Sequence, residues 1–190
     1  GIIGEKKEVS FVADKVPMGV KALTEVAWHD AARSIMTTDR FPKAVVRKVK
    51  IGNSDVILAG IAKGSTMIAP DMGTMLSFLF TDAKIPGKVL QSCLTRAVNR
   101  SFYCISVDGD TSTSDTVLLS ATGQVKLQPK VERASDPVLK NFRVALEEMT
   151  IELARMIVRD GAATGNLLTC DVVGAASQRA ARNIGRAIVD

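Results

Sequence analysis

The feature that most restricts the fold is a pair of β-branched runs joined by a two-residue turn. The runs KAVVRKVKI and DVILAGIA flank Gly52 and Asn53, a combination typical of a tight hairpin. We therefore predict antiparallel strands over 43–51 and 55–62. A sheet that contains this hairpin does not consist of βαβ units alone, so the expected fold class is mixed α/β.

Helical and extended patterns alternate along the rest of the chain. The apolar residues between 18 and 34 recur at helical spacing, with Pro17 in the first turn, and a longer amphipathic pattern runs from 135 to 161. The predicted helices cover 18–34, 86–97, 135–161 and 177–188, and further predicted strands cover 75–80, 102–108, 116–120 and 167–174. The polar stretch 126–136 is expected to be an exposed connector.

The composition argues against several classes of protein. With 190 residues, 46% of them apolar, the chain can bury one sizeable core. No run approaches the roughly 18 apolar residues that a membrane helix needs, and the opening residues lack an export signal. The three cysteines are widely separated without a CxxC pair. We therefore expect no disulfide framework, no metal site and a reducing, cytoplasmic location.

The net charge of +5 raises the question of nucleic-acid binding. The basic residues are scattered among 20 acidic ones, and aromatic residues make up only 4% of the chain, so no surface for stacking bases is indicated. Arg179, Arg182 and Arg186 share one face of the last predicted helix, which we interpret as a solvated face. Nucleic acid is not an expected partner.

The pair Gly73-Thr74 stands directly before the predicted strand at 75–80. A threonine hydroxyl is a poor nucleophile until a base takes its proton, and the α-amine of an N-terminal threonine can be that base. Such an enzyme must first cut its own chain, and Gly73 leaves the preceding carbonyl unhindered. By spacing alone, however, the pair is more typical of a bend that opens a strand.

Longer stretches of the sequence resemble the ornithine acetyltransferase family, also called glutamate N-acetyltransferase. The resemblance lies in KGSTMIAPDMGTMLSFLFTD, IMTTDRFPK, NRSFYCISVDGDTSTSDT and VVGAAS, and it covers nearly the whole chain. Gly73 stands where the family commonly has alanine, a change compatible with cleavage. The resemblance implies a layered mixed-sheet α/β sandwich similar to that of self-cleaving aminopeptidases.

The resemblance also implies an activity and an assembly. Residues 1–73 would form part of an α-chain and residues 74–190 part of a β-chain, released by self-cleavage between Gly73 and Thr74. Thr74 would carry acetyl from N-acetylornithine to glutamate in arginine biosynthesis. The family needs no cofactor, some members also accept acetyl-CoA, and the chains would assemble as an α2β2 heterotetramer.

Three further residues receive roles from the resemblance. Lys63 and Thr37 would line the substrate site, where a lysine can pair with a carboxylate and a threonine can hydrogen-bond it. Gly1 would be the second member of an oxyanion-stabilising Thr-Gly pair. Without the resemblance, Lys63 is interpreted as a surface lysine, Thr37 as the end of a helix and Gly1 as a frayed terminus.

The sequence also departs from the family. The loop after the long predicted helix reads DGAATGN, with Ala162 in place of a glutamate that meets the amine of the substrate. This places recognition of ornithine in question, and the chain is interpreted as a fragment of a longer precursor. An amidase or aminopeptidase on the same scaffold, or an inactive homologue, remains an alternative. His29 is expected on a helix surface and Cys104 in the core.

Overall fold

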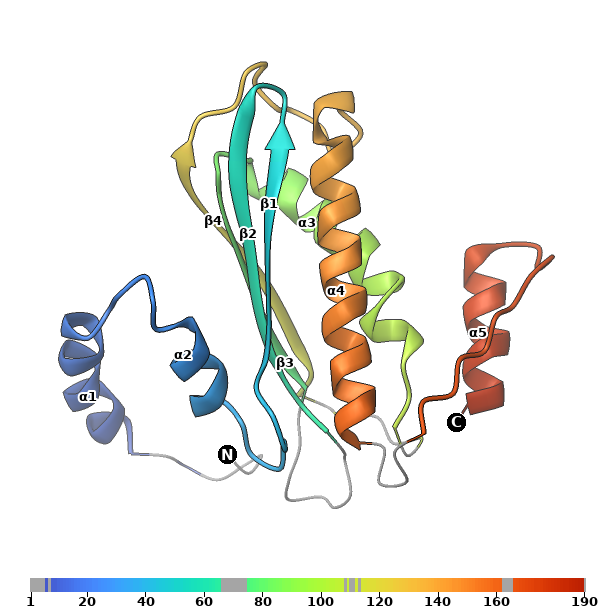
Figure 1. Ribbon diagram of the computed structural model, residues 1–190, viewed down its shortest axis with the longest axis horizontal. Coiled ribbons are helices and arrows are strands. Elements are labelled where there is room, and N and C mark those ends of the chain that lie inside the picture. The colour runs from blue at the N-terminus through green and yellow to red at the C-terminus, as the bar shows by residue number, and fades with distance from the viewer. Residues whose placement is uncertain are drawn as a thin grey trace.

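The computed structural model describes residues 6, 8–65, 75–107, 109, 112, 114–161 and 166–189. Its centre is a four-stranded sheet in the order β1-β2-β3-β4 (Figure 1). The strands are β1 (Lys43–Ile51), β2 (Ser54–Lys63), β3 (Leu76–Ala83) and β4 (Thr116–Val125). Strands β1, β2 and β3 pair antiparallel, whereas β3 and β4 pair parallel, so the expectation of a mixed α/β fold is confirmed.

The predicted hairpin is present with the expected register. Ile51 lies opposite Ser54, and the turn residue Gly52 has a φ of +58°, a conformation that side chains rarely adopt. A Cβ atom at this position would also lie 2.5 Å from the carbonyl oxygen of Gln128. Both constraints explain why the turn needs a glycine here.

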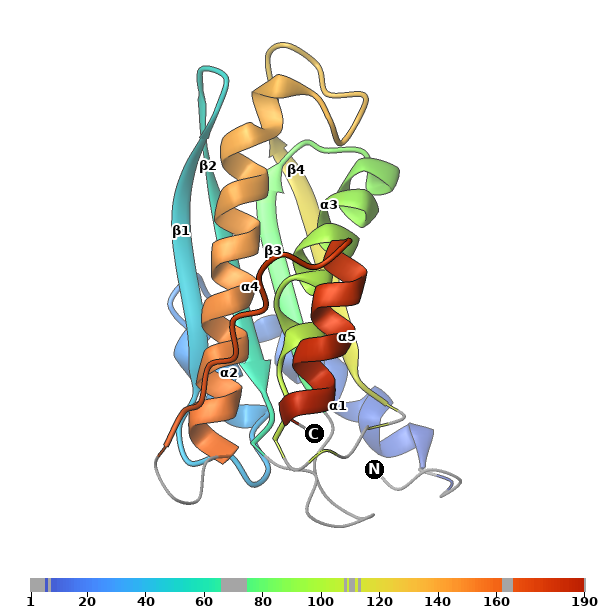
Figure 2. The same ribbon diagram turned by 90° about the vertical axis from the view of Figure 1, so that its right-hand side faces the viewer.

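Two helices cover one face of the sheet. Helix α4 (Lys140–Gly161) packs on β1 and β2, and α3 (Gly87–Asn99) packs beside α4 (Figure 2). The core between helix and sheet is built from completely buried side chains, among them Leu58, Leu79, Phe142, Leu146, Met149 and Leu153. The predicted long helix is thus confirmed, with a short 3₁₀ turn, η2 (Pro137–Leu139), before it.

The single helix predicted over 18–34 is wrong. The structure has α1 (Val9–Lys21) and a separate α2 (Trp28–Ser34), and Pro17 lies inside α1. No residue of α1 is buried, so its apolar periodicity does not reflect packing on this core. The second helix starts at Trp28, whose ring packs edge-on against Phe80 with centroids 5.3 Å apart.

The strand predicted over 102–108 is also wrong, because the chain continues to turn after α3. Ser101 donates a hydrogen bond to the carbonyl of Ala97, and a 3₁₀ turn, η1 (Phe102–Cys104), follows. Phe102 is buried, but Cys104 is exposed and is therefore not a core residue.

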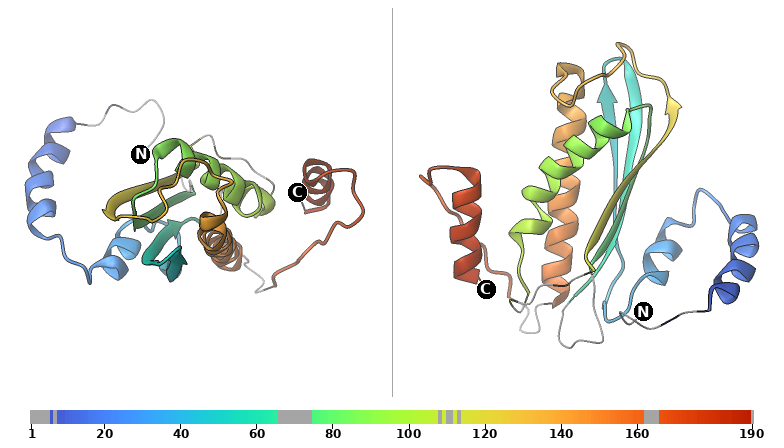
Figure 3. Two further views of the ribbon diagram at one scale, coloured as in Figure 1. Left: turned by 90° about the horizontal axis from the view of Figure 1, so that it is seen from above. Right: turned by 180° about the vertical axis from the view of Figure 1, so that it is seen from behind.

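The segment predicted as a strand at 167–174 contains no strand among its described residues, and Leu168 is 88% exposed. The final helix α5 (Gln178–Val189) is confirmed, with the hydroxyl of Ser177 accepting a bond from the Ala180 amide. Helices α1 and α5 lie on opposite sides of the core (Figure 3). Of the described helices, none combines the length and the apolar character needed to cross a membrane.

Three smaller expectations have mixed outcomes. The connector 126–136 is not wholly exposed, since Leu127 and Val131 are buried. His29 is exposed on the surface of α2, as predicted. Arg182 is not simply solvated, because its guanidinium donates to the backbone carbonyl and the side-chain oxygen of Asn99, each at 2.8 Å.

Candidate functional site

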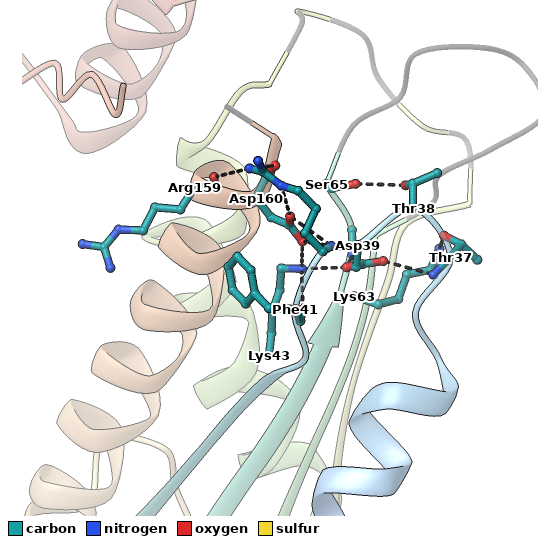
Figure 4. Close-up of polar contacts among 11 residues, drawn as sticks. Thr37, Thr38, Asp39, Phe41, Lys43, Lys63, Ser65, Arg159 and Asp160 are labelled. Atoms are coloured by element: carbon teal, nitrogen blue, oxygen red, sulfur yellow. Dashed lines mark hydrogen bonds and ion pairs between the residues drawn. The ribbon is translucent and has the colours of Figure 1, made fainter. Parts of the chain in front are cut away.

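Polar side chains gather at the end of the sheet where β2 ends and β3 begins. Lys63 is the last residue of β2 and pairs in register with Leu76, the first residue of β3. The end of β2 is buried because α4 covers one face of the strand and α2 contacts it as well. The loop between α2 and β1 runs past this end and contributes several of the polar groups (Figure 4).

The loop and strand β2 bring Thr37 and Lys63 together. The Nζ atom of Lys63 donates a hydrogen bond of 3.0 Å to the Thr37 hydroxyl. Lys63 is only 5% exposed, and this burial lowers the pKa of its amine. The nearby carboxylate of Asp39 acts in the opposite direction and raises it, whereas Lys43 lowers it further. The net effect is an amine with a pKa below its ordinary value.

Asp39 accepts hydrogen bonds from Thr37, Lys43 and Gly64. One of its oxygens, Oδ1, accepts bonds from the Lys43 ammonium at 2.6 Å and from the Gly64 amide at 2.7 Å. The other, Oδ2, accepts from the Thr37 amide at 3.2 Å. Burial by itself would raise the pKa of the Asp39 carboxyl, but these bonds together outweigh burial and hold the pKa below its usual value.

Lys43 connects the loop to the end of α4. Its side chain is completely buried, and its Nζ lies 2.5 Å from Oδ2 of Asp160 as well as 2.6 Å from Asp39. The same ammonium lies 4.8 Å from the centre of the Phe41 ring. The two carboxylates that flank the buried lysine offset part of the cost of removing its charge from water.

Asp160 stands in the last turn of α4, where a negative charge is unfavourable next to the free helix carbonyls. Arg40 compensates for this. Its backbone amide and its Nε donate to the carboxylate, at 3.1 Å and 3.0 Å to Oδ1. Its guanidinium also donates to the carbonyls of Arg159 and Asp160. The loop is thereby fastened to the end of the helix.

One further polar contact lies just beyond the end of β2. The hydroxyls of Thr38 and Ser65 lie 2.9 Å apart. Gly64 has a φ of +140°, and a Cβ there would lie 3.4 Å from the Cα of Met75. Met75, the residue that follows Thr74 in the sequence, is therefore beside the chain that leaves Lys63. Among the described residues, no group of three His, Cys, Asp or Glu side chains gathers as a metal site.

The structure thus brings together two of the residues singled out by the sequence, Thr37 and Lys63. The other predicted site residues, Gly1, Gly73 and Thr74, lie outside the described residues, as does Ala162. The location of the cleavage site between the proposed chains, 1–73 and 74–190, is untested for the same reason.

Sequence reasoning missed Asp39, Lys43 and Asp160. A signal for Asp160 existed, because it continues the apolar face of α4 that includes Leu153 and Ile157. A charged residue on a buried helix face requires a partner. In the pattern DRFPK, Asp39 and Lys43 stand four residues apart before a strand, but nothing in the sequence links them to Asp160.

Comparison with known proteins adds an independent observation. A sequence profile described as the ArgJ family matches residues 1–190. The arginine biosynthesis bifunctional protein ArgJ of Gluconobacter oxydans is 47% identical over 190 residues, covering 100% of this chain and 45% of the relative. The protein of the same name from Bartonella quintana is 45% identical over 191 residues, covering 100% and 46%. The chain thus spans about half the length of these curated relatives.

A solved structure is also similar. The crystal structure of the arginine biosynthesis bifunctional protein ArgJ from Bacillus halodurans matches with 42% sequence identity and a TM-score of 0.41. The match covers 47% of this chain and 41% of that one.

Proposed function

Because this chain belongs to the ArgJ family, we propose that it forms part of an acetyltransferase that moves acetyl from N-acetylornithine to glutamate. The relatives are named for arginine biosynthesis, which supports the pathway. They are also named bifunctional, and we include acetyl-CoA as a second acetyl donor because the resemblance to the family implies it. The enzyme acts in the cytoplasm and needs no cofactor.

The proposed enzyme matures by cutting itself between Gly73 and Thr74. The Thr74 hydroxyl attacks the Gly73 carbonyl, a C–O bond replaces the C–N bond, and the nitrogen takes a proton and becomes a free amine. Water then hydrolyses the ester and leaves a Gly73 carboxylate and a Thr74 hydroxyl. The resulting chains, α from the segment ending at Gly73 and β from the segment starting at Thr74, assemble as α2β2.

The acetyl transfer follows the same chemistry. The freed amine of Thr74 accepts the proton of its own hydroxyl, and the hydroxyl oxygen attacks the acetyl carbonyl of N-acetylornithine. The acetyl–nitrogen bond breaks, the nitrogen of ornithine takes the proton and leaves, and acetyl remains on Thr74 as an ester. The amine of glutamate then attacks this ester and restores the hydroxyl. Gly1 supplies an oxyanion donor for the intermediates.

The observation that carries the proposal is the contact between Lys63 and Thr37. These residues are 26 positions apart in the chain, yet their polar atoms meet at 3.0 Å beside the strand end next to Met75. A lysine ammonium and a hydroxyl so arranged can bind a substrate carboxylate together, with a charge-assisted hydrogen bond from the lysine. Both substrates are amino acids, so both carry such a carboxylate.

Self-cleavage gives the first test. The full-length protein should separate into two bands on denaturing electrophoresis without added protease, and the second band should begin at Thr74. The variant Thr74→Ala should remain one band. The control variant Thr38→Ala, which keeps Thr74, should still give two bands. A new N-terminus at any other residue would contradict the proposed processing.

Steady-state kinetics give the second test and separate the rival reactions. A covalent intermediate predicts parallel lines in double-reciprocal plots with N-acetylornithine and glutamate as the two substrates. An amidase on the same scaffold would release acetate at a rate independent of glutamate. Because Ala162 replaces a carboxylate expected to meet the amine of ornithine, we expect a high KM for N-acetylornithine that falls in Ala162→Glu.

A further inference from the structure

We propose that Asp39 is a positioning residue that holds the Lys63–Thr37 pair in register and supplies the negative charge that faces Lys63. The inference rests on the proposed function, because it assigns Asp39 to the same substrate site. Neither the sequence pattern nor the family resemblance gave a role to Asp39.

Asp39 joins the loop to the end of β2 through two backbone amides. Its Oδ2 accepts a hydrogen bond from the amide of Thr37, and its Oδ1 accepts one from the amide of Gly64. Gly64 directly follows Lys63 in the sequence. One rigid carboxylate therefore fixes the loop that carries the hydroxyl relative to the strand that carries the amine (Figure 4).

Lys43 and Lys63 extend in different directions from the end of the sheet. Lys43 points towards α4, where it reaches Asp160, whereas Lys63 points to the loop and reaches Thr37. Asp39 lies at the sheet end and acts on both lysines, through a direct bond to Lys43 and through its charge on Lys63. It therefore links the helix-anchored half of the cluster to the half that meets substrate.

Asp39 also supplies the negative charge that acts on Lys63. The charged groups that act on Lys63 are Asp39 from the loop and Lys43 from β1, while Asp160 from α4 and Arg40 from the loop face each other. Burial lowers the pKa of Lys63 and Lys43 lowers it further, so Asp39 is the group that opposes both. Without Asp39, the amine would lose its proton at a lower pH and would bind a carboxylate less well.

Asp160 provides a matched control. Both carboxylates are buried and both bind the ammonium of Lys43, at 2.6 Å for Asp39 and 2.5 Å for Asp160. Only Asp39 also binds the amides of Thr37 and Gly64. The substitutions Asp39→Asn and Asp160→Asn thus remove one charge from the same lysine and preserve side-chain shape, but only the first one disturbs the Lys63–Thr37 pair.

The experiment uses the full-length protein with 13C-labelled lysine, and the signal of Lys63 is assigned by its loss in Lys63→Met. In Asp39→Asn, the midpoint of the Lys63 titration should fall by about one pH unit relative to wild type. The KM for N-acetylornithine should rise about tenfold, with kcat changing less than about threefold, because the pair binds substrate and transition state alike. In Asp160→Asn, the titration of Lys63 should remain within about 0.3 pH unit of wild type.

The outcomes separate the inference from the proposed function. The lysine titration needs no catalysis, so a wild-type protein without acetyltransferase activity would overturn the function while the titration still tests Asp39. An unchanged Lys63 midpoint in Asp39→Asn, or equal changes in both variants, would overturn the positioning role. If Asp39→Asn does not fold, the variant Asp39→Glu tests the positioning role instead. A Lys63 midpoint near that of wild type together with a raised KM for N-acetylornithine would support that role, and an unchanged KM would contradict it.

Discussion

The two ends of the β1–β2 hairpin hold charges in opposite ways. At the turn, Lys48 and Asp55 form a cross-strand ion pair of 3.5 Å whose side chains are 74% and 58% exposed. At the other end, the side chains of Lys43, Asp39 and Asp160 are completely buried and closer together. The hairpin thus has an exposed ion pair at its turn and, at its other end, a buried cluster in which Lys43 of β1 meets Asp39 of the loop and Asp160 of α4.

The buried end of the hairpin departs from simple apolar packing. Exposed ion pairs contribute only about 0–1 kcal/mol to stability, and buried ones often contribute no more than apolar side chains of the same size. A buried cluster is therefore poorly explained by stability alone. Its position beside the Lys63–Thr37 pair points to organisation of the candidate site.

The largest expected effect comes from neutralising the buried lysine. Lys43→Met keeps the length of the side chain but leaves Asp39 and Asp160 without their shared cation, and we expect a loss of about 3–5 kcal/mol in the free energy of unfolding. Urea denaturation measures this loss in the free energy of unfolding. The matched variant Lys48→Met at the turn should change the free energy by less than about 0.5 kcal/mol. Equal losses in the two variants would contradict the distinction between the two ends.

The next effect concerns the glycines that flank β2. Gly52→Ala forces a side chain into a left-handed conformation and against the carbonyl of Gln128, which should cost about 2 kcal/mol. Self-cleavage at Thr74 should nevertheless proceed. Gly64→Ala should slow self-cleavage, because Gly64 lies beside Met75 and donates its amide to Asp39. Electrophoresis over a time course measures the rate of self-cleavage in both variants. Slow cleavage in Gly52→Ala but not in Gly64→Ala would refute a role of Gly64 in self-cleavage.

A smaller effect is expected in the dependence of stability on pH. The pKa of Asp39 in the folded protein lies below the ordinary value of 3.8, so its stabilising contribution is complete above that value and is lost as the pH falls through the folded pKa. Asp39→Asn should therefore flatten the decline in stability below about pH 4. Thermal unfolding between pH 2 and pH 6 would measure it.

Asp136 provides the comparison for this titration. Its pKa is also lowered, first by the amides of Arg133 and Glu132, but the group lies on the surface of the connector. Asp136→Asn should flatten the acid decline less than Asp39→Asn does. An acid profile that is the same in wild type and Asp39→Asn would show that Asp39 is not charged in the way described.

The sequence was sufficient for the hairpin and for the amphipathic helices α3 and α4, because local turn chemistry and periodicity agree there with the packing that follows. It failed where apolar residues do not pack on this core. In α1, and between Leu167 and Gly174, the patterns predicted the wrong boundary or the wrong element, and most of these apolar side chains are exposed. Local patterns do not reveal what covers a segment.

The site could be predicted only in part for a similar reason. Thr37 and Lys63 followed from the resemblance to a family, whereas the cluster around Lys43 depends on contacts over more than 100 residues, such as that with Asp160. Single-sequence patterns carry no information on such pairs. A charge on an apolar helix face is the nearest available warning, and it does not name the partner.

We propose that Thr74, the residue that directly precedes Met75 in the sequence, carries acetyl during the reaction. In the most direct experiment, the self-cleaved enzyme produced from the complete precursor is mixed with N-acetylornithine without glutamate. The reaction is quenched rapidly, and the peptides are analysed by mass spectrometry. We predict one acetyl group on the peptide that begins at Thr74, its removal on addition of glutamate, and a reduced yield in Lys63→Met at low donor concentration. Acetyl transfer to glutamate without any acetylated Thr74 peptide would contradict a covalent intermediate on Thr74.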